Sequence, residues 1–258
     1  MAKIQFSDAT NKTGLVELLG RATGTQDATT STYPLKQKTV DINDALDWFL
    51  MLARKACPNI KIDDTNFTGE PVYSQNLSSS TNAYVFTVDA SSAQIQGIDH
   101  VEIETATGKT KRLNQMNPNM VGYNNDVNDT LANDAIDTGE PTSYRIVGKY
   151  IILDKKPNYT TATGTGLRLY HDRCAYYFVS TDTAVFPGIN NLFHSYLWLR
   201  PAYFWVNLKK GSAAASGLRN DLETMESFID MYFSDLHNRD VTKTKTVQRM
   251  KAKPQNNK

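Results

Sequence analysis

The chain has 258 residues, 40% of them hydrophobic, and a formal net charge of +1. This length and composition allow a sizeable buried core, in one large domain or two small ones, and exclude a chain that is disordered throughout. The near-zero charge gives no overall attraction to nucleic acid or membranes, so any electrostatic role must be local. No apolar run approaches the roughly 18 residues that cross a bilayer, and the first residues lack the apolar stretch of a signal peptide. We therefore expect a soluble protein that is not secreted by that route.

Two helices are predicted before residue 60. Residues 13–23 place leucines on one side of a short helix, which is followed by a polar, threonine-rich loop. Asp41, with Asp44 three residues on, resembles the capping box that begins a helix. Apolar residues then recur at helical spacing until Pro58, which cannot continue a helix. The two cysteines, Cys57 and Cys174, lie far apart in sequence and are expected to be free thiols in a reducing compartment.

The middle of the chain has the alternation of strands. Residues 63–80 are rich in turn formers and indicate a boundary, after which 84–88 and 101–104 read as strands. Two hairpins are predicted, with turns at 106–109 and at Gly148-Lys149. Two back-to-back strands are expected within 167–179, with a turn near Asp172. Residues 114–139 are rich in Asn and Asp and are interpreted as a long surface loop, with ion or partner binding left open.

An aromatic helix is expected to begin near Gly188 and to kink or break near Leu197, because Pro201 follows. This helix is apolar nearly all round and needs cover on more than one side, from the same chain or from neighbouring subunits. The candidates for subunit contacts are Tyr196, Trp198, Tyr203 and Trp205. Residues 211–217 are interpreted as a small-residue linker. The apolar residues of 218–236 then follow a heptad-like seam, for packing within the chain or between chains.

The basic tail, residues 237–258, carries seven basic residues and one acid. We expect it to be disordered alone and to become ordered on a partner. Attraction to nucleic acid and a simple solubilising role are the alternatives. The candidate partner-binding residues of the tail are Arg239, Lys243, Lys245, Arg249, Lys251 and Lys253.

The sequence contains few signs of catalysis. It has no HExxH or CxxC motif, and its four histidines are far apart. Gly108-Lys109-Thr110 resembles the end of a phosphate-binding loop, but Ile103 stands where that motif needs glycine. We therefore expect no catalytic residue, no cofactor and no metal, although calcium in an unusual geometry within 114–139 stays open.

One order of features resembles a known family. A glycine, a proline and a tyrosine precede a short turn and two strands, and a polar Ser/Thr-Asp step, a proline and a histidine-containing helix come after them. Here these features are Gly139, Pro141, Tyr144, Gly148, 151–153, Pro157, 167–170, Ser180-Thr181-Asp182, Phe186-Pro187 and Phe193-His194. The pattern is similar to that of the head-to-tail connector (adaptor) proteins of tailed bacteriophages, over residues 139–206. The resemblance implies a ring, most often of twelve subunits, that docks under the portal, binds it through a C-terminal extension and continues the channel for DNA.

We therefore expect an α+β protein in which N- and C-terminal helices form a bundle around an inserted antiparallel β-sandwich or barrel. The expected domains are a helical segment (1–81), a β domain (82–180), C-terminal helices (181–236) and a flexible basic tail (237–258). The expected function is that of a structural virion protein and not of an enzyme. Its partners would be the portal, the next tail protein, further copies of itself and passing double-stranded DNA, without a membrane, at the head–tail interface of a virion assembled in the host cytoplasm. The alternative is a β-sandwich that binds a carbohydrate or protein on a host surface.

Overall fold

The protein is a mixed α+β chain that divides into two compact units. The computed structural model describes residues 3–26, 32–86, 95–116, 137–162 and 164–251, with side chains described up to residue 239. The helical unit comprises Met1–Ile60, Thr65–Phe67 and Tyr177–Lys258, and the β unit comprises Lys61–Asp64 and Thr68–Tyr176. Both ends of the chain thus belong to the helical unit. The β unit takes in residues 68–81, which we had expected to belong to the N-terminal helical segment.

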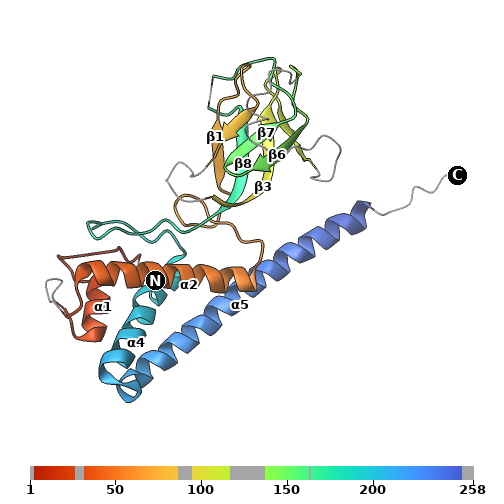
Figure 1. Cartoon of the computed structure of the whole chain (residues 1–258). Helices are drawn as coiled ribbons and strands as arrows, with labels where there is room; N and C mark the ends of the chain where they lie inside the picture. The colour runs from red at the N-terminus through yellow and green to blue at the C-terminus, as the bar shows by residue number, and fades with distance from the viewer. Residues whose placement is uncertain (1–2, 27–31, 87–94, 117–136, 163, 252–258) are drawn as a thin grey trace. The chain divides into compact units, whose positions relative to one another are not determined.

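The helical unit is built from four α-helices in the described residues (Figure 1): α1 (Leu15–Thr23), α2 (Leu35–Ala56), α4 (Tyr196–Lys210) and α5 (Ser212–Lys251), with a short 3₁₀ helix at Asn191–Phe193. Helices α2, α4 and α5 pack against one another, and α1 packs against α2 and α4. Phe193 lies fully buried at the centre of this packing, and the centroids of four other aromatic rings lie 5.2 to 5.8 Å from the centroid of its ring. The apolar seam of α5 is used within the chain, since Leu222, Ile229 and Phe233 are buried here.

Helix α2 ends where Pro58 predicts but begins six residues earlier than Asp41. Pro34 occupies the N-cap position with φ −68° and ψ 155°. The fixed φ of proline suits the start of a helix, so this residue initiates α2 without a side-chain cap. Asp41 instead lies inside the helix.

The aromatic helix also differs from expectation. Gly188 has φ +80°, and a Cβ there would collide with the carbonyl oxygen of Thr65, so this residue forms a turn and α4 begins only at Tyr196. Helix α4 continues through Pro201 without a break, held by its contacts with three other helices. The expected linker at 211–217 is also wrong. Ala213, Ala214 and Ala215 are strong helix formers, and they belong to α5, which begins at Ser212.

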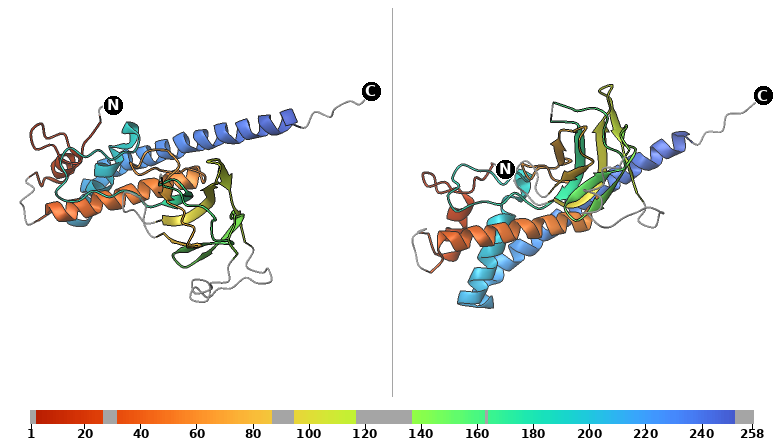
Figure 2. Two further views of the ribbon diagram at one scale, coloured as in Figure 1. Left: turned by 90° about the horizontal axis from the view of Figure 1, so that it is seen from above. Right: turned by 45° about the horizontal axis from the view of Figure 1, so that its top comes forward.

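The basic tail is not disordered along its whole length. Helix α5 runs for 40 residues and ends at Lys251, so it includes the first fifteen residues of the tail. The physical reason is that no glycine or proline lies between Leu218 and Pro254. Figures 1 and 2 show the end of α5 extending beyond the ends of α2 and α4.

The β unit contains eight strands in the described residues. They are β1 (Val72–Gln75), β2 (Ala83–Val85), β3 (Ile95–Glu104), β4 (Thr110–Arg112), β5 (Asn114–Gln115), β6 (Ser143–Val147), β7 (Tyr150–Leu153) and β8 (Leu167–Arg173). They form two four-stranded sheets with orders β1-β8-β3-β4 and β2-β7-β6-β5. All pairs are antiparallel except β5–β6. Each sheet has two edges, so the unit is not a closed barrel.

Both predicted hairpins are confirmed, β3–β4 with Gly108 at φ +73° and β6–β7 with Gly148 at φ +57°. The turn predicted near Asp172 is wrong, because Asp172 pairs with Gly97 inside the continuous strand β8. Both sheets contribute to one core of ten buried residues, Leu77, Tyr84, Val101, Ile103, Leu113, Tyr144, Ile151, Leu153, Leu167 and Leu169. Most of residues 114–139 lie outside the described part of the chain.

Candidate functional site

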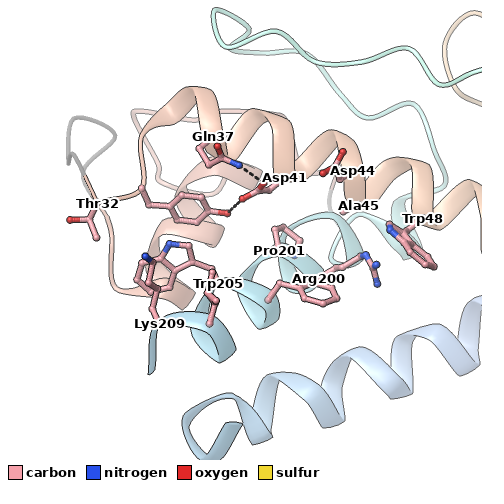
Figure 3. A pocket seen from close by; sticks show the side chains of 13 residues that line it. Thr32, Gln37, Asp41, Asp44, Ala45, Trp48, Arg200, Pro201, Trp205 and Lys209 are labelled. Carbon is pink, nitrogen blue, oxygen red and sulfur yellow. Dashed lines mark hydrogen bonds between the residues drawn. The ribbon is translucent and has the colours of Figure 1, made fainter. Parts of the chain in front are cut away.

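A groove lies between α2 and α4 in the helical unit. Its volume is about 570 Å³. It is lined by Thr32, Tyr33, Gln37, Asp41, Asp44, Ala45, Trp48, Arg200, Pro201, Phe204, Trp205, Leu208 and Lys209 (Figure 3). We call this surface the α2–α4 groove. Helical periodicity places the lining residues on one face of each helix. Those of α2 recur at three- and four-residue steps, and those of α4 are the adjacent pairs 200–201, 204–205 and 208–209, each four residues after the one before.

The walls of the groove are aromatic and accessible. Trp48 is 43% exposed, Phe204 51% and Leu208 80%. Val40 and Met51, on the solvent-facing side of α2, are also more than half exposed. Large apolar side chains grouped on one exposed face are characteristic of an interaction surface.

A hydrogen-bonded cluster closes one end of the groove. The Tyr33 hydroxyl donates to one carboxylate oxygen of Asp41 (2.6 Å), and the Gln37 amide donates to the other (2.7 Å). Burial raises the pKa of Tyr33, and the adjacent Asp41 carboxylate raises it further. Tyr33 also stacks on Trp205, with ring centroids 5.5 Å apart. Both carboxylate oxygens of Asp41 at this end are therefore already hydrogen-bonded within the chain.

Arg200 crosses the middle of the groove. Its guanidinium carbon lies 4.2 Å from the centroid of the Trp48 ring and 4.8 Å from that of Phe204. One of its nitrogens lies 3.5 Å from a carboxylate oxygen of Glu226 on α5. The groove thus presents apolar walls with a fixed cation between them. Such a surface suits docking of a partner's side chains.

No protein-family model and no curated protein matches this chain. The function must therefore be argued from the chain's own geometry.

The four predicted subunit-contact residues fall in different environments. Tyr196 is fully buried and donates a hydrogen bond to Glu226 (3.2 Å), so it belongs to the unit's own core. Trp198 and Tyr203 are half-buried. Of these four residues, only Trp205 lines the groove. Trp48, Phe204 and Leu208 also line it, and the sequence analysis did not single them out. The usable signal was the four-residue spacing of Arg200, Phe204 and Leu208, on the side of α4 away from its buried positions.

The candidate residues of the basic tail lie on or beyond the last turns of α5. Arg239 is exposed, and its Nε donates to the carbonyl of Asp235 (3.3 Å). Lys243, Lys245, Arg249 and Lys251 have helical backbone but side chains outside the description, and Lys253 lies beyond the described residues.

One group in the described part of the chain has metal-ligating residues close together, Glu70, Asp99 and His100, whose ligand atoms lie within 4.8 Å of one another. The ammonium of Lys61 lies 3.5 Å from Asp99 and 3.3 Å from Asp172, so a cation from the chain itself already balances this surface. His171 and His194 are buried elsewhere. Among the described helices, none is long and apolar enough to cross a membrane.

Proposed function

We propose that the chain is a structural virion protein, the head-to-tail connector of a tailed bacteriophage. It would assemble as a ring, twelvefold by family resemblance, at the head–tail interface of a virion made in the host cytoplasm. It would bind the portal above and a tail protein below, and line the path of double-stranded DNA without reading its sequence. It would not act as an enzyme or need a cofactor. In this proposal the helical unit is a bundle that forms the ring wall and carries the β unit as a sandwich.

The observation that best supports this proposal is helix α5. Its first half is anchored by buried side chains such as Leu222 and Ile229, and its last turns bring the basic tail beyond the other helices of its unit. A helix of this kind is a semi-rigid spacer that holds a charged segment at a fixed distance from its base. Binding of the tail to an acidic cleft of the portal is the role that fits this geometry.

The alternative, a β-sandwich that recognises a host surface, would be favoured by a row of exposed aromatic residues on the β unit. Among the described residues of that unit, the large apolar side chains with the highest exposure are Val72, Val85 and Tyr176, with only one aromatic residue among them. This distribution supports the connector over the alternative.

The test is binding of purified portal rings to the immobilised chain. A variant with Arg239, Lys243, Lys245, Arg249, Lys251 and Lys253 changed to glutamine should lose most of its affinity. Wild-type binding should weaken as salt is raised, because exposed charges are screened. A control with four basic residues that are exposed elsewhere, Lys36, Lys55, Lys109 and Lys149, changed to glutamine should bind as wild type. Equal losses in both variants, or none in either, would contradict a specific role of the tail.

A further inference from the structure

The α2–α4 groove has no cover from its own chain in the described structure. Helix α5 packs against both α2 and α4, yet none of its residues lines the groove. Glu226, on the inner face of α5, lies 3.5 Å from Arg200, so this inner face borders the groove. The outer face of α5, which carries Met231, is turned away from α2 and α4.

That outer face is acidic and carries one large apolar side chain. Residues 212–236 contain five acids, of which Glu226 faces inward to Tyr196 and Arg200, and a single basic residue, Arg219, which pairs with Glu223 (2.8 Å). Asp230 and Asp235 are exposed and flank Met231, whose side chain is 57% exposed. Met231 and Asp235 share a face because they are four residues apart.

The α4 side of the groove has the complementary character. Helix α4 contains no acid and three basic residues, Arg200, Lys209 and Lys210. Arg200, which pairs with Glu226, and Lys209 line this wall beside the exposed Phe204 and Leu208, whereas the acids of the groove, Asp41 and Asp44, belong to the α2 wall. An acidic helix with a protruding methionine fits this wall in both charge and polarity, and methionine adapts well to aromatic surfaces.

We propose that the α2–α4 groove receives the outer face of α5 from a second copy of this chain, with Met231 inserted between Phe204 and Leu208. This inference rests on the ring of the proposed function and names its interface. Two different surfaces of one subunit make a heterologous contact, and such contacts repeat from copy to copy until a ring closes.

Cysteine cross-linking tests this contact directly. Cys57 is buried, so Cys174→Ser provides a background without an accessible thiol. In that background Leu208→Cys and Met231→Cys are made separately and together, and the proteins are treated with a short bismaleimide. Positions 208 and 231 of one copy are far apart, because 19 residues of α5 separate Met231 from the start of the helix, a rise of roughly 28 Å.

We expect a mixture of the two single variants to give cross-linked dimers, and the double variant to give a ladder of larger oligomers. Dimers from Leu208→Cys alone would mean that groove meets groove, which overturns the proposal. An assembled ring without 208–231 cross-links would overturn this interface and leave the connector standing. A chain that stays monomeric at every concentration, with and without portal, would overturn both.

A second measurement does not depend on cross-linking geometry. Met231→Glu and Leu208→Glu alter exposed side chains and should leave folding intact, yet each should weaken self-association by about tenfold or more, as for a central interface residue. Val85→Glu on the β unit, where the side chain is 43% exposed, is the control and should assemble normally. Assembly of the Met231→Glu and Leu208→Glu variants at wild-type affinity would contradict the proposal.

Discussion

Phe193→Ala should be the most damaging single truncation in the helical unit. Phe193 is 0% exposed, and its ring lies 5.3 Å from Phe49, 5.8 Å from Phe228, 5.2 Å from Tyr232 and 5.7 Å from Phe233. Truncation of a buried phenylalanine costs about 3–5 kcal/mol. The four aromatic neighbours, contributed by α2 and α5, cannot all close over the cavity, so we expect about 4 kcal/mol. With a urea dependence of about 2 kcal/mol per molar, the unfolding midpoint falls by roughly 2 M.

Tryptophan fluorescence measures this loss selectively. The chain has three tryptophans, Trp48, Trp198 and Trp205, and all lie in the helical unit. Phe204→Ala is the matched control, because Phe204 is on the adjoining helix but 51% exposed, and it should cost under about 1 kcal/mol. Equal, small effects of both changes would refute the placement of Phe193 at the centre of the helical packing.

Three further changes test other parts of the chain. Gly188→Ala should destabilise the helical unit by several times the roughly 1 kcal/mol expected for Gly148→Ala. Both residues have positive φ, but only at Gly188 would a Cβ collide with the backbone of Thr65. Similar shifts of the urea midpoint in the two variants would contradict this. Burial lowers the pKa of His194, whose Nδ1 accepts a hydrogen bond from the Ile4 amide (3.0 Å). The unfolded chain therefore takes up a proton before the folded one does, so the unfolding free energy should fall from about pH 7 to about pH 5, and His194→Gln should flatten that slope; an unchanged slope would count against it. Asp154 accepts hydrogen bonds from the Thr142 hydroxyl (2.6 Å) and from the amides of Thr142 (2.9 Å) and Ser143 (3.2 Å). Asp154→Ala should lower the unfolding free energy of the β unit by about 2 kcal/mol, followed by tyrosine near-ultraviolet circular dichroism, and should leave the unfolding curve from tryptophan fluorescence unchanged. A shift in the fluorescence curve alone would argue against a role of Asp154 in the β unit.

Local signals in the sequence were sufficient for the hairpins and for some helix ends. Gly108 and Gly148 mark turns that need positive φ, and Pro58 stops α2, because these constraints act within a few residues. Helix starts were less visible. Asp41 has the chemistry of a cap, yet Pro34 begins α2 earlier, and the Asp41 carboxylate serves Tyr33 and Gln37 instead.

The length of α5 and the lining of the α2–α4 groove depend on tertiary packing, which local sequence patterns do not predict. Charge and low hydrophobicity predicted a disordered tail, but α5 propagates from its anchored first half as far as Lys251, without a glycine or proline to stop it. The crowding of aromatic residues after Pro187 left two interpretations open, packing within the chain and contact with other subunits. Which aromatic residues are exposed follows from the packing of α2 and α5 on α4, and so Tyr196 proved to be core while Trp48 and Phe204 line the groove.

The connector proposal is tested most directly by native mass spectrometry of the chain mixed with its portal, for the full-length protein and for a truncation after His237. The last fully buried side chain of α5 that the structure describes is Phe233, so the truncation should keep the helical unit folded. The account predicts a complex of fixed stoichiometry for the full-length chain, with a whole ring of copies per portal, and no complex for the truncation. A full-length chain that never joins the portal would contradict the account.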